Sequence, residues 1–187
     1  MVPGPALTEQ WRAHLTDNRR RSQHTVRAYA ATAERLLAFL AEHWGERPVA
    51  SRLGMISQAD LRAFLAMRRG EGLANRSTAR ELSAIRAFLR FVASQSETQS
   101  SLPQIKGPRM KRSLPRPIAP DDIMALGAAM AERSAPPWVQ ARDWAVLMLL
   151  YGAGLRISEA TGLTGASLPL GETLRITGKG GKQRVVP

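Results

Sequence analysis

Apolar residues recur every three or four positions through the N-terminal half of the chain, which predicts a small domain of four helices. A short first helix carries Leu7, Trp11 and Leu15 on one side. The longest helix is entered at Ser22 and ends at Gly45. Its apolar stripe consists of Val26, Ala30, Ala33, Leu37, Leu40 and Trp44.

The third and fourth helices follow at short intervals. The third opens at Ser57, where Asp60 completes a pattern typical of a capping box, and it ends at Gly70 and Gly72. It buries Leu61, Phe64 and Leu65. The fourth helix spans about residues 77–93. Short connections between four helices predict a compact all-α domain.

On a helical projection of the fourth helix, apolar and basic residues occupy separate arcs. The basic arc, with the helix extended back to Arg76, contains Arg76, Arg80, Arg86 and Arg90; the apolar arc contains Leu82, Ile85, Phe88, Leu89, Phe91 and Val92. Small residues between the arginines, Ala79, Ser83 and Ala87, would let the backbone approach a duplex. We therefore expect DNA contact on this face, with plain solvation as the alternative. Glu81 falls in the apolar arc, and we assign it to the dipole at the start of the helix.

A second set of features lies near the C-terminal end. A strongly apolar helix runs through residues 138–151 into Gly152 and Gly154, and another helix begins just after Arg156. A guanidinium beside a helix start is suited to hold two phosphate oxygens and cannot lose its proton. Glu159 would brace it. The alternative is an arginine that pairs only with Glu159.

Residues 173–177 and 183–186 alternate as two strands, and the glycine-rich turn between them predicts an antiparallel hairpin. Its tip presents Lys179 and Lys182. An ammonium there suits proton donation or a clamp on a phosphodiester. The alternative is a turn lysine without a role.

The distribution of charge suggests two domains. The net charge of +12 points to a polyanionic partner, and residues 99–120 contain five basic residues, no acidic residue and five prolines. We predict a helical domain over 1–98, an extended basic linker over 99–120 and a second domain over 121–187. The alternative for the linker is a solvated tether with no partner.

Composition excludes several classes of site. The absence of cysteine rules out disulfides, thiolate nucleophiles, zinc fingers and iron–sulfur clusters, and His14, His24 and His43 lack the spacing of a metal pair. We expect no metal and no cofactor. The longest apolar stretch, residues 144–155, falls short of the roughly twenty residues that span a bilayer. No secretory signal is recognisable, and we expect a cytoplasmic protein.

At these motifs the chain resembles the tyrosine site-specific recombinases, and among them the Xer recombinases that resolve chromosome dimers. Residues 150–159 (LYGAGLRISE) are similar to the family's catalytic-arginine box, and residues 176–187 (ITGKGGKQRVVP) to its lysine hairpin. Residues 22–29 and 77–88 resemble its core-binding domain, and residues 114–117 its interdomain link. The sequence of residues 76–80 most resembles the XerC branch.

This resemblance implies a mainly α fold with a small antiparallel β-hairpin: a four-helix, SAM-like core-binding domain, then the truncated α+β catalytic domain of a tyrosine recombinase. It implies that Arg156 binds the scissile phosphate, that Lys179 protonates the leaving 5′ oxygen and that no metal takes part. The partners would be a duplex recombination site and a second Xer-type recombinase in a tetramer on the nucleoid. The expected DNA contacts are Arg20, Arg21, Ser22, Thr25, Arg27, Arg76, Ser77, Arg80, Arg86, Arg90, Lys111, Arg112, Lys182 and Arg184.

The resemblance stops short of the nucleophile. The family continues with a His-x-x-Arg box and a C-terminal tyrosine, whereas the sequence ends at Pro187, and Tyr29 and Tyr151 lack the nucleophile's context. We expect Tyr151 in the core. We interpret the chain as an N-terminal fragment that binds duplex DNA without cleaving it. The alternatives are a naturally short, non-catalytic DNA-binding protein, a phage or integron integrase, and a helical protein that binds RNA.

Overall fold

The computed structural model describes residues 4–19, 21–95, 103–109, 117–133 and 135–187. The chain divides into two compact units, Met1–Arg112 and Ser113–Pro187. Helices dominate, and one small antiparallel sheet follows them, so the predicted fold class is confirmed. No described helix is long and apolar enough to cross a membrane.

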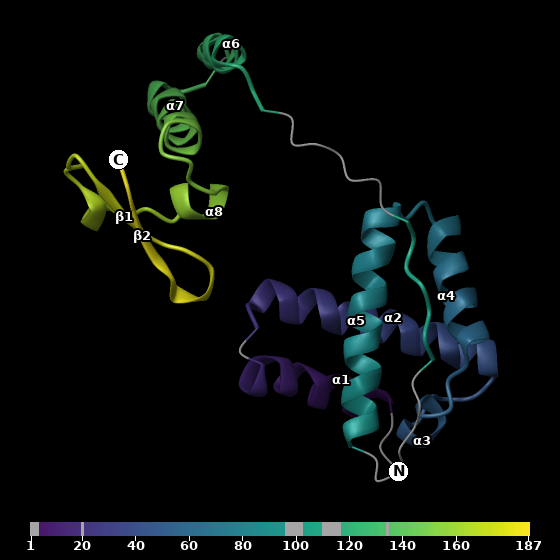
Figure 1. The fold of residues 1–187 in the computed structure, drawn as a ribbon. Helices are drawn as coiled ribbons and strands as arrows, with labels where there is room; N and C mark the ends of the chain where they lie inside the picture. The colour runs from purple at the N-terminus through teal and green to yellow at the C-terminus, as the bar shows by residue number, and fades with distance from the viewer. Residues whose placement is uncertain (1–3, 20, 96–102, 110–116, 134) are drawn as a thin grey trace. The chain divides into compact units, whose positions relative to one another are not determined.

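The first unit contains the four predicted helices (Figure 1). Its elements are α1 (Gly4–Ala13), the π-helical turn η1 (His14–Asn18), α2 (Gln23–Trp44), α3 (Ala50–Leu53), α4 (Gln58–Gly70) and α5 (Asn75–Ser94). Ser22 caps α2 by accepting a hydrogen bond from the backbone N–H of Thr25, and Gly45 ends it with φ of 69°. Ser57 and Asp60 form the predicted capping box of α4. The local signals therefore fix where these helices begin and end.

The helices of the first unit share one apolar core. Trp11 from α1 contacts Phe88 and Phe91 of α5, with ring centroids 5.9 and 5.2 Å apart. The largest side chains that are fully buried are Phe64, Phe88, Leu7, Leu36, Leu40, Leu53, Leu61, Leu82, Ile85 and Val92. Each fully buried aliphatic or aromatic side chain of this size stabilises the fold by about 1.5–3 kcal/mol. The apolar stripes read from the sequence are thus the surfaces that hold the unit together.

Two parts of the first unit differ from the sequence prediction. The four-residue helix α3 was not predicted, because a single turn is too short to show a helical period. Ile105 lies inside the predicted linker but is buried in the core of the first unit. The compact unit therefore extends beyond the predicted boundary at residue 98. Ile105 anchors this segment to the core, and a single apolar residue shows no helix or strand periodicity in the sequence.

The second unit is smaller and has a modest core. It consists of α6 (Pro120–Ala131), α7 (Pro137–Tyr151), α8 (Ile157–Ala160), the 3₁₀ turns η2 (Gly165–Ser167) and η3 (Lys179–Gly181), and the strands β1 (Leu174–Thr177) and β2 (Gln183–Val186). The strands pair antiparallel, with Ile176 opposite Arg184, as the hairpin prediction requires. Ile176 and Val186 pack with Leu155 and Ala160. The hairpin thus rests on the turn that carries Arg156.

One prediction about this unit is wrong. Tyr151 was expected in the core, yet it is 46% exposed. It is the last residue of α7, and the chain turns away at Gly152, so no further helical turn covers the ring. Its exposure does not place it in the sequence context of the family's nucleophile.

Candidate functional site

The basic face of α5 is exposed over most of its length. Arg76, Arg80 and Arg90 are exposed, and Ser77 is half-buried near the start of the helix. None of the three arginines makes an ion pair or hydrogen bond with the part of the chain that the structure describes. Three permanent charges without acid partners are available to a polyanion.

Arg86, the fourth arginine of this face, is placed differently. It is half-buried, and its guanidinium donates a hydrogen bond to the backbone carbonyl of Ile105. Sequence periodicity assigned it to the same arc as Arg80 and Arg90, but periodicity does not show what packs against that arc. The structure therefore gives Arg86 a partner within the protein.

Glu81 is clamped by two arginines, which corrects its assignment to the helix dipole. Its side chain is 8% exposed and accepts hydrogen bonds from Arg35 Nη2 at 2.9 Å and from Arg68 Nη2 at 3.1 Å. The hydrogen bonds to Glu81 raise the pKa of Arg68. This cluster joins α2, α4 and α5. It holds the arginine-bearing helix to its neighbours.

The start of α2 gathers further cations. Arg21 and Arg27 are exposed, whereas the hydroxyls of Ser22 and Thr25 lie 2.9 Å apart and share a hydrogen bond. Arg19, Arg21 and Arg90 line a cavity of about 260 Å³ together with Tyr29. Arg19 was not among the predicted contacts, although the basic run of residues 19–21 was a visible signal. Arg20, Lys111 and Arg112 lie outside the described residues.

Arg156 occupies the turn between α7 and α8. Gly154 has φ of 62°, a conformation that favours glycine, and Leu155 is buried just after it. These two residues fix the backbone from which Arg156 projects, and its side chain is 68% exposed. The guanidinium is therefore open to solvent on a well-defined turn.

The helix that follows, α8, contributes less to the attraction of an anion than we expected. α8 has four residues, so its dipole is small, and the backbone N–H of Arg156 already donates to Glu159 Oε2 at 2.8 Å. A helix-start site for an anion is thus not what the structure provides. The Arg156 guanidinium is the group that remains to attract a phosphate.

Glu159 is the centre of a compact network. Its side chain is 4% exposed and accepts hydrogen bonds from Arg156 Nη1 at 2.8 Å and from Arg184 Nη1 and Nη2 at 2.9 and 2.7 Å. The hydrogen bonds from Arg184, followed by that from the Arg156 backbone, hold the pKa of Glu159 well below its usual range. The carboxylate is therefore ionised and shared between two arginines.

The predicted brace between Glu159 and Arg156 is present, and a second arginine joins it. Arg184 comes from β2 and was predicted as a DNA contact, but its guanidinium faces Glu159. The reason is the hairpin register, which places Arg184 opposite Ile176 and therefore on the face of the hairpin that is buried. With two arginines and one glutamate, the network keeps one net positive charge.

The hairpin tip lies next to this network in sequence. A Cβ added at Gly178 would come within 3.2 Å of Glu159 Oε1, so the strand entering the tip passes close to the carboxylate. Lys179 begins the tight turn η3, and its side chain lies outside what the structure describes. Lys182 is exposed at the end of the turn. The base of the hairpin is thus tied to the Arg156 turn.

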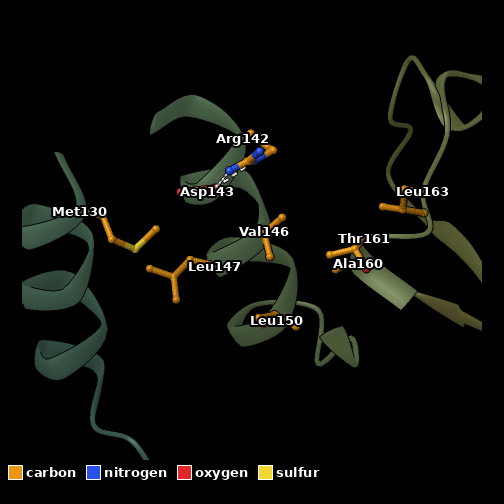
Figure 2. Close-up of a pocket in the computed structure, with 9 residues that line it drawn as sticks. All are labelled: Met130, Arg142, Asp143, Val146, Leu147, Leu150, Ala160, Thr161 and Leu163. Atoms are coloured by element: carbon orange, nitrogen blue, oxygen red, sulfur yellow. Dashed lines mark hydrogen bonds and ion pairs between the residues drawn. The ribbon is translucent and has the colours of Figure 1, made fainter. Parts of the chain in front are cut away.

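A cavity of about 680 Å³ in the second unit has a different character (Figure 2). Apolar side chains from α6, α7, the end of α8 and Leu163 line it, and Arg142 and Asp143 form an ion pair at its edge. Such a lining offers no free cation to a phosphate. Within the described ranges, no three histidine, aspartate or glutamate side chains gather as a metal site.

Comparison with known proteins finds similarity along nearly the whole chain. Residues 8–96 match the phage integrase N-terminal SAM-like domain. Proteins named tyrosine recombinase XerC from Brucella suis, Bradyrhizobium diazoefficiens and Methylobacterium nodulans are 40%, 41% and 44% identical over 97%, 98% and 100% of the chain. The chain spans 59–60% of the length of these relatives. Residues 8–96 are thus similar to the N-terminal SAM-like domain of the phage integrases, and nearly the whole chain is similar to proteins named tyrosine recombinase XerC.

Proposed function

We propose that the chain is the DNA-binding part and the first section of the catalytic domain of a site-specific tyrosine recombinase of the XerC type. The observation that carries the proposal is the exposed Arg156 guanidinium on a fixed turn, braced by a buried carboxylate. The arginines of α5 and of the α2 start that have no acidic partner among the described residues supply the electrostatic attraction to duplex DNA. The names of the relatives support a recombinase of the XerC type over a non-catalytic DNA-binding protein and over a phage or integron integrase.

In the proposed reaction a tyrosine oxygen attacks the scissile phosphorus, and the 5′ oxygen of the next nucleotide leaves. Arg156 binds the non-bridging oxygens and offsets the charge that grows on them. Lys179, on the hairpin tip, gives a proton to the leaving oxygen. Rejoining is the reverse of these steps. Neither Tyr29 nor Tyr151 matches the family's nucleophile, so we expect the 187-residue chain to bind DNA without cutting it.

The proposed partners are a duplex recombination site and a second Xer-type recombinase, with which the protein would form a tetramer. The process served would be the resolution of chromosome dimers on the nucleoid, in the cytoplasm. Arg184 is better explained as a partner of Glu159 than as a contact to DNA, whereas Arg21, Arg27, Arg76, Arg80 and Arg90 remain proposed contacts.

The first experiment measures binding of the chain to a mixed-sequence duplex and to single-stranded RNA over a salt series. We expect tighter binding to the duplex. Arg156→Gln is expected to weaken duplex binding and to lower the slope of log affinity against log salt by about 1, the loss of one phosphate contact.

The matched control is Arg142→Gln, the same change of charge on an exposed arginine of the second unit that pairs with Asp143. It is expected to leave affinity and slope nearly unchanged. Equal or tighter binding to RNA would end the DNA proposal. Identical effects of the two substitutions on affinity and slope would show that Arg156 does not bind a phosphate.

A further inference from the structure

Residues 103–109 form a strap along the first unit, a segment that the sequence placed in a free linker. Ile105 is 7% exposed, and it lies in a groove of about 540 Å³ lined also by Leu61 from α4 and by Leu82 and Leu89 from α5. Figure 1 shows the strap running beside α4 and α5. The burial of Ile105 gives this stretch a fixed place on the domain.

Two side chains hold the backbone of the strap on either side of this anchor. Gln58 Nε2 donates to the carbonyl of Gln104 at 2.9 Å, and the Arg86 guanidinium donates to the carbonyl of Ile105. The two donors come from α4 and α5, so each wall of the groove makes one hydrogen bond to the strap. A backbone carbonyl that accepts from a guanidinium is a stronger anchor than a neutral pair.

The strap carries a charge next to the arginine face. Lys106 is exposed, because neighbouring side chains of an extended chain point to opposite sides and Ile105 points inward. Lys106, Arg86 and Arg90 line the same groove. Lys106 and Arg90 make no ion pair or hydrogen bond with any residue that the structure describes. Docking therefore places one more free cation beside α5.

We infer that Arg86 is a positioning residue, which pins the strap through Ile105 so that Lys106 and Arg90 form one cationic surface for the phosphates of a duplex. The inference rests on the proposed DNA binding and changes the role of Arg86 within it. Arg86 acts through the strap, and Lys106 makes the contact. An uncharged residue facing the core, Ile105, then controls the affinity for DNA.

The test measures binding of the 187-residue chain to a mixed-sequence duplex over a salt series. Ile105→Ser removes no charge, yet we expect it to weaken binding about fivefold and to lower the salt slope by about 1, because Lys106 leaves the surface. Arg86→Met and Lys106→Gln are expected to have the same effect. The Arg86→Met/Ile105→Ser double variant is expected to be no weaker than either single variant, since both release one strap.

A second measurement does not depend on DNA. Trypsin cleavage after Lys106 is expected to be about tenfold faster in Ile105→Ser and Arg86→Met than in the wild type, because the docked strap is protected. Gln58→Ala, at an exposed position on α4, releases one hydrogen bond without touching the core and is expected to give an intermediate rate. Circular dichroism of each variant checks that it retains its helices.

The outcomes separate this inference from the proposed function. If the wild-type chain shows no preference for a duplex, the proposed function fails. If the wild type binds and Ile105→Ser binds equally well, or if the Arg86 and Ile105 losses add, Arg86 contacts DNA directly and the inference fails. Equal trypsin rates in the wild type and the variants would also overturn it.

Discussion

Glu81→Gln is expected to destabilise the first unit by about 2–3 kcal/mol. The glutamate side chain is 8% exposed and receives hydrogen bonds from Arg35 and Arg68. Glutamine has nearly the same volume and keeps one acceptor, so the substitution removes the charge without leaving a cavity. It isolates the electrostatic contribution of the cluster.

The magnitude follows from the exposure of the two arginines. Arg68 is 15% exposed, and a hydrogen bond to a charged group in such a site contributes about 1.5–3 kcal/mol. Arg35 is 41% exposed, so solvent screens its pair and we assign it less than about 1 kcal/mol. Glutamine retains part of the first contribution, and Arg68 keeps its ion pair with Glu71. An interaction with the helix dipole alone would contribute about 0.3–1 kcal/mol.

The assay is urea unfolding followed by the NMR amide signals of α5, which report on the first unit. The expected loss corresponds to a fall in Tm of about 10–20 °C for a unit of this size. Glu42→Gln is the matched control, because Glu42 is exposed on α2 and makes no ion pair with a described residue. It should change stability by less than about 0.5 kcal/mol. If both substitutions lower the free energy of unfolding by the same small amount, the ion pairs of Glu81 with Arg35 and Arg68 do not stabilise the unit. The interaction of Glu81 with the helix dipole would then be the better explanation.

Two further predictions concern the helix cap and the arginine network. Ser57→Ala is expected to destabilise the first unit by about 1 kcal/mol in urea unfolding, because it removes the cap of α4. The control Ser83→Ala removes a hydroxyl in the middle of α5 and should leave the stability unchanged. Equal losses of stability in the two variants would contradict the role of the cap. In the wild type the pKa of Glu159 is lower in the folded protein than its ordinary value near 4.5. The ionised carboxylate therefore stabilises the second unit above about pH 4.5, and this stabilisation is lost as the pH falls through the lower pKa of the folded protein. Arg184→Gln should raise the Glu159 pKa, measured by the carboxyl ¹³C shift, and so flatten the acid-side loss of stability of the second unit; an unchanged pKa would show that Arg156 alone holds the carboxylate.

Local signals in the sequence predicted most of the secondary structure. The serine caps at Ser22 and Ser57 and the αL glycine at Gly45 mark helix ends through hydrogen bonds and backbone conformations that span a few residues. The hairpin was equally readable, because its strands are joined by a short glycine-rich turn. Such features depend on near neighbours and are visible in one dimension.

Partners of charged side chains that lie far away in the sequence were the part that the sequence did not reveal, whereas the nearby pair of Arg156 and Glu159 was predicted. Arg86 and Arg184 both looked like free cations, and each is used inside the protein, by the Ile105 carbonyl and by Glu159. The basic arc of α5 was correctly placed as a surface for Arg76, Arg80 and Arg90. A helical projection gives the direction of a side chain but not what lies in that direction.

The sequence by itself determined the helices, the hairpin, the basic character of the chain and the exposed arginine that follows the glycine turn. The tertiary structure decided which charges are neutralised and which remain free. Glu81 accepts a hydrogen bond from Arg35, which lies 46 positions away in the sequence, and Glu159 accepts one from Arg184, which lies 25 positions away. The physical reason is that periodicity and capping act between residues a few positions apart, whereas ion pairs and buried anchors such as Ile105 form only when distant segments pack together.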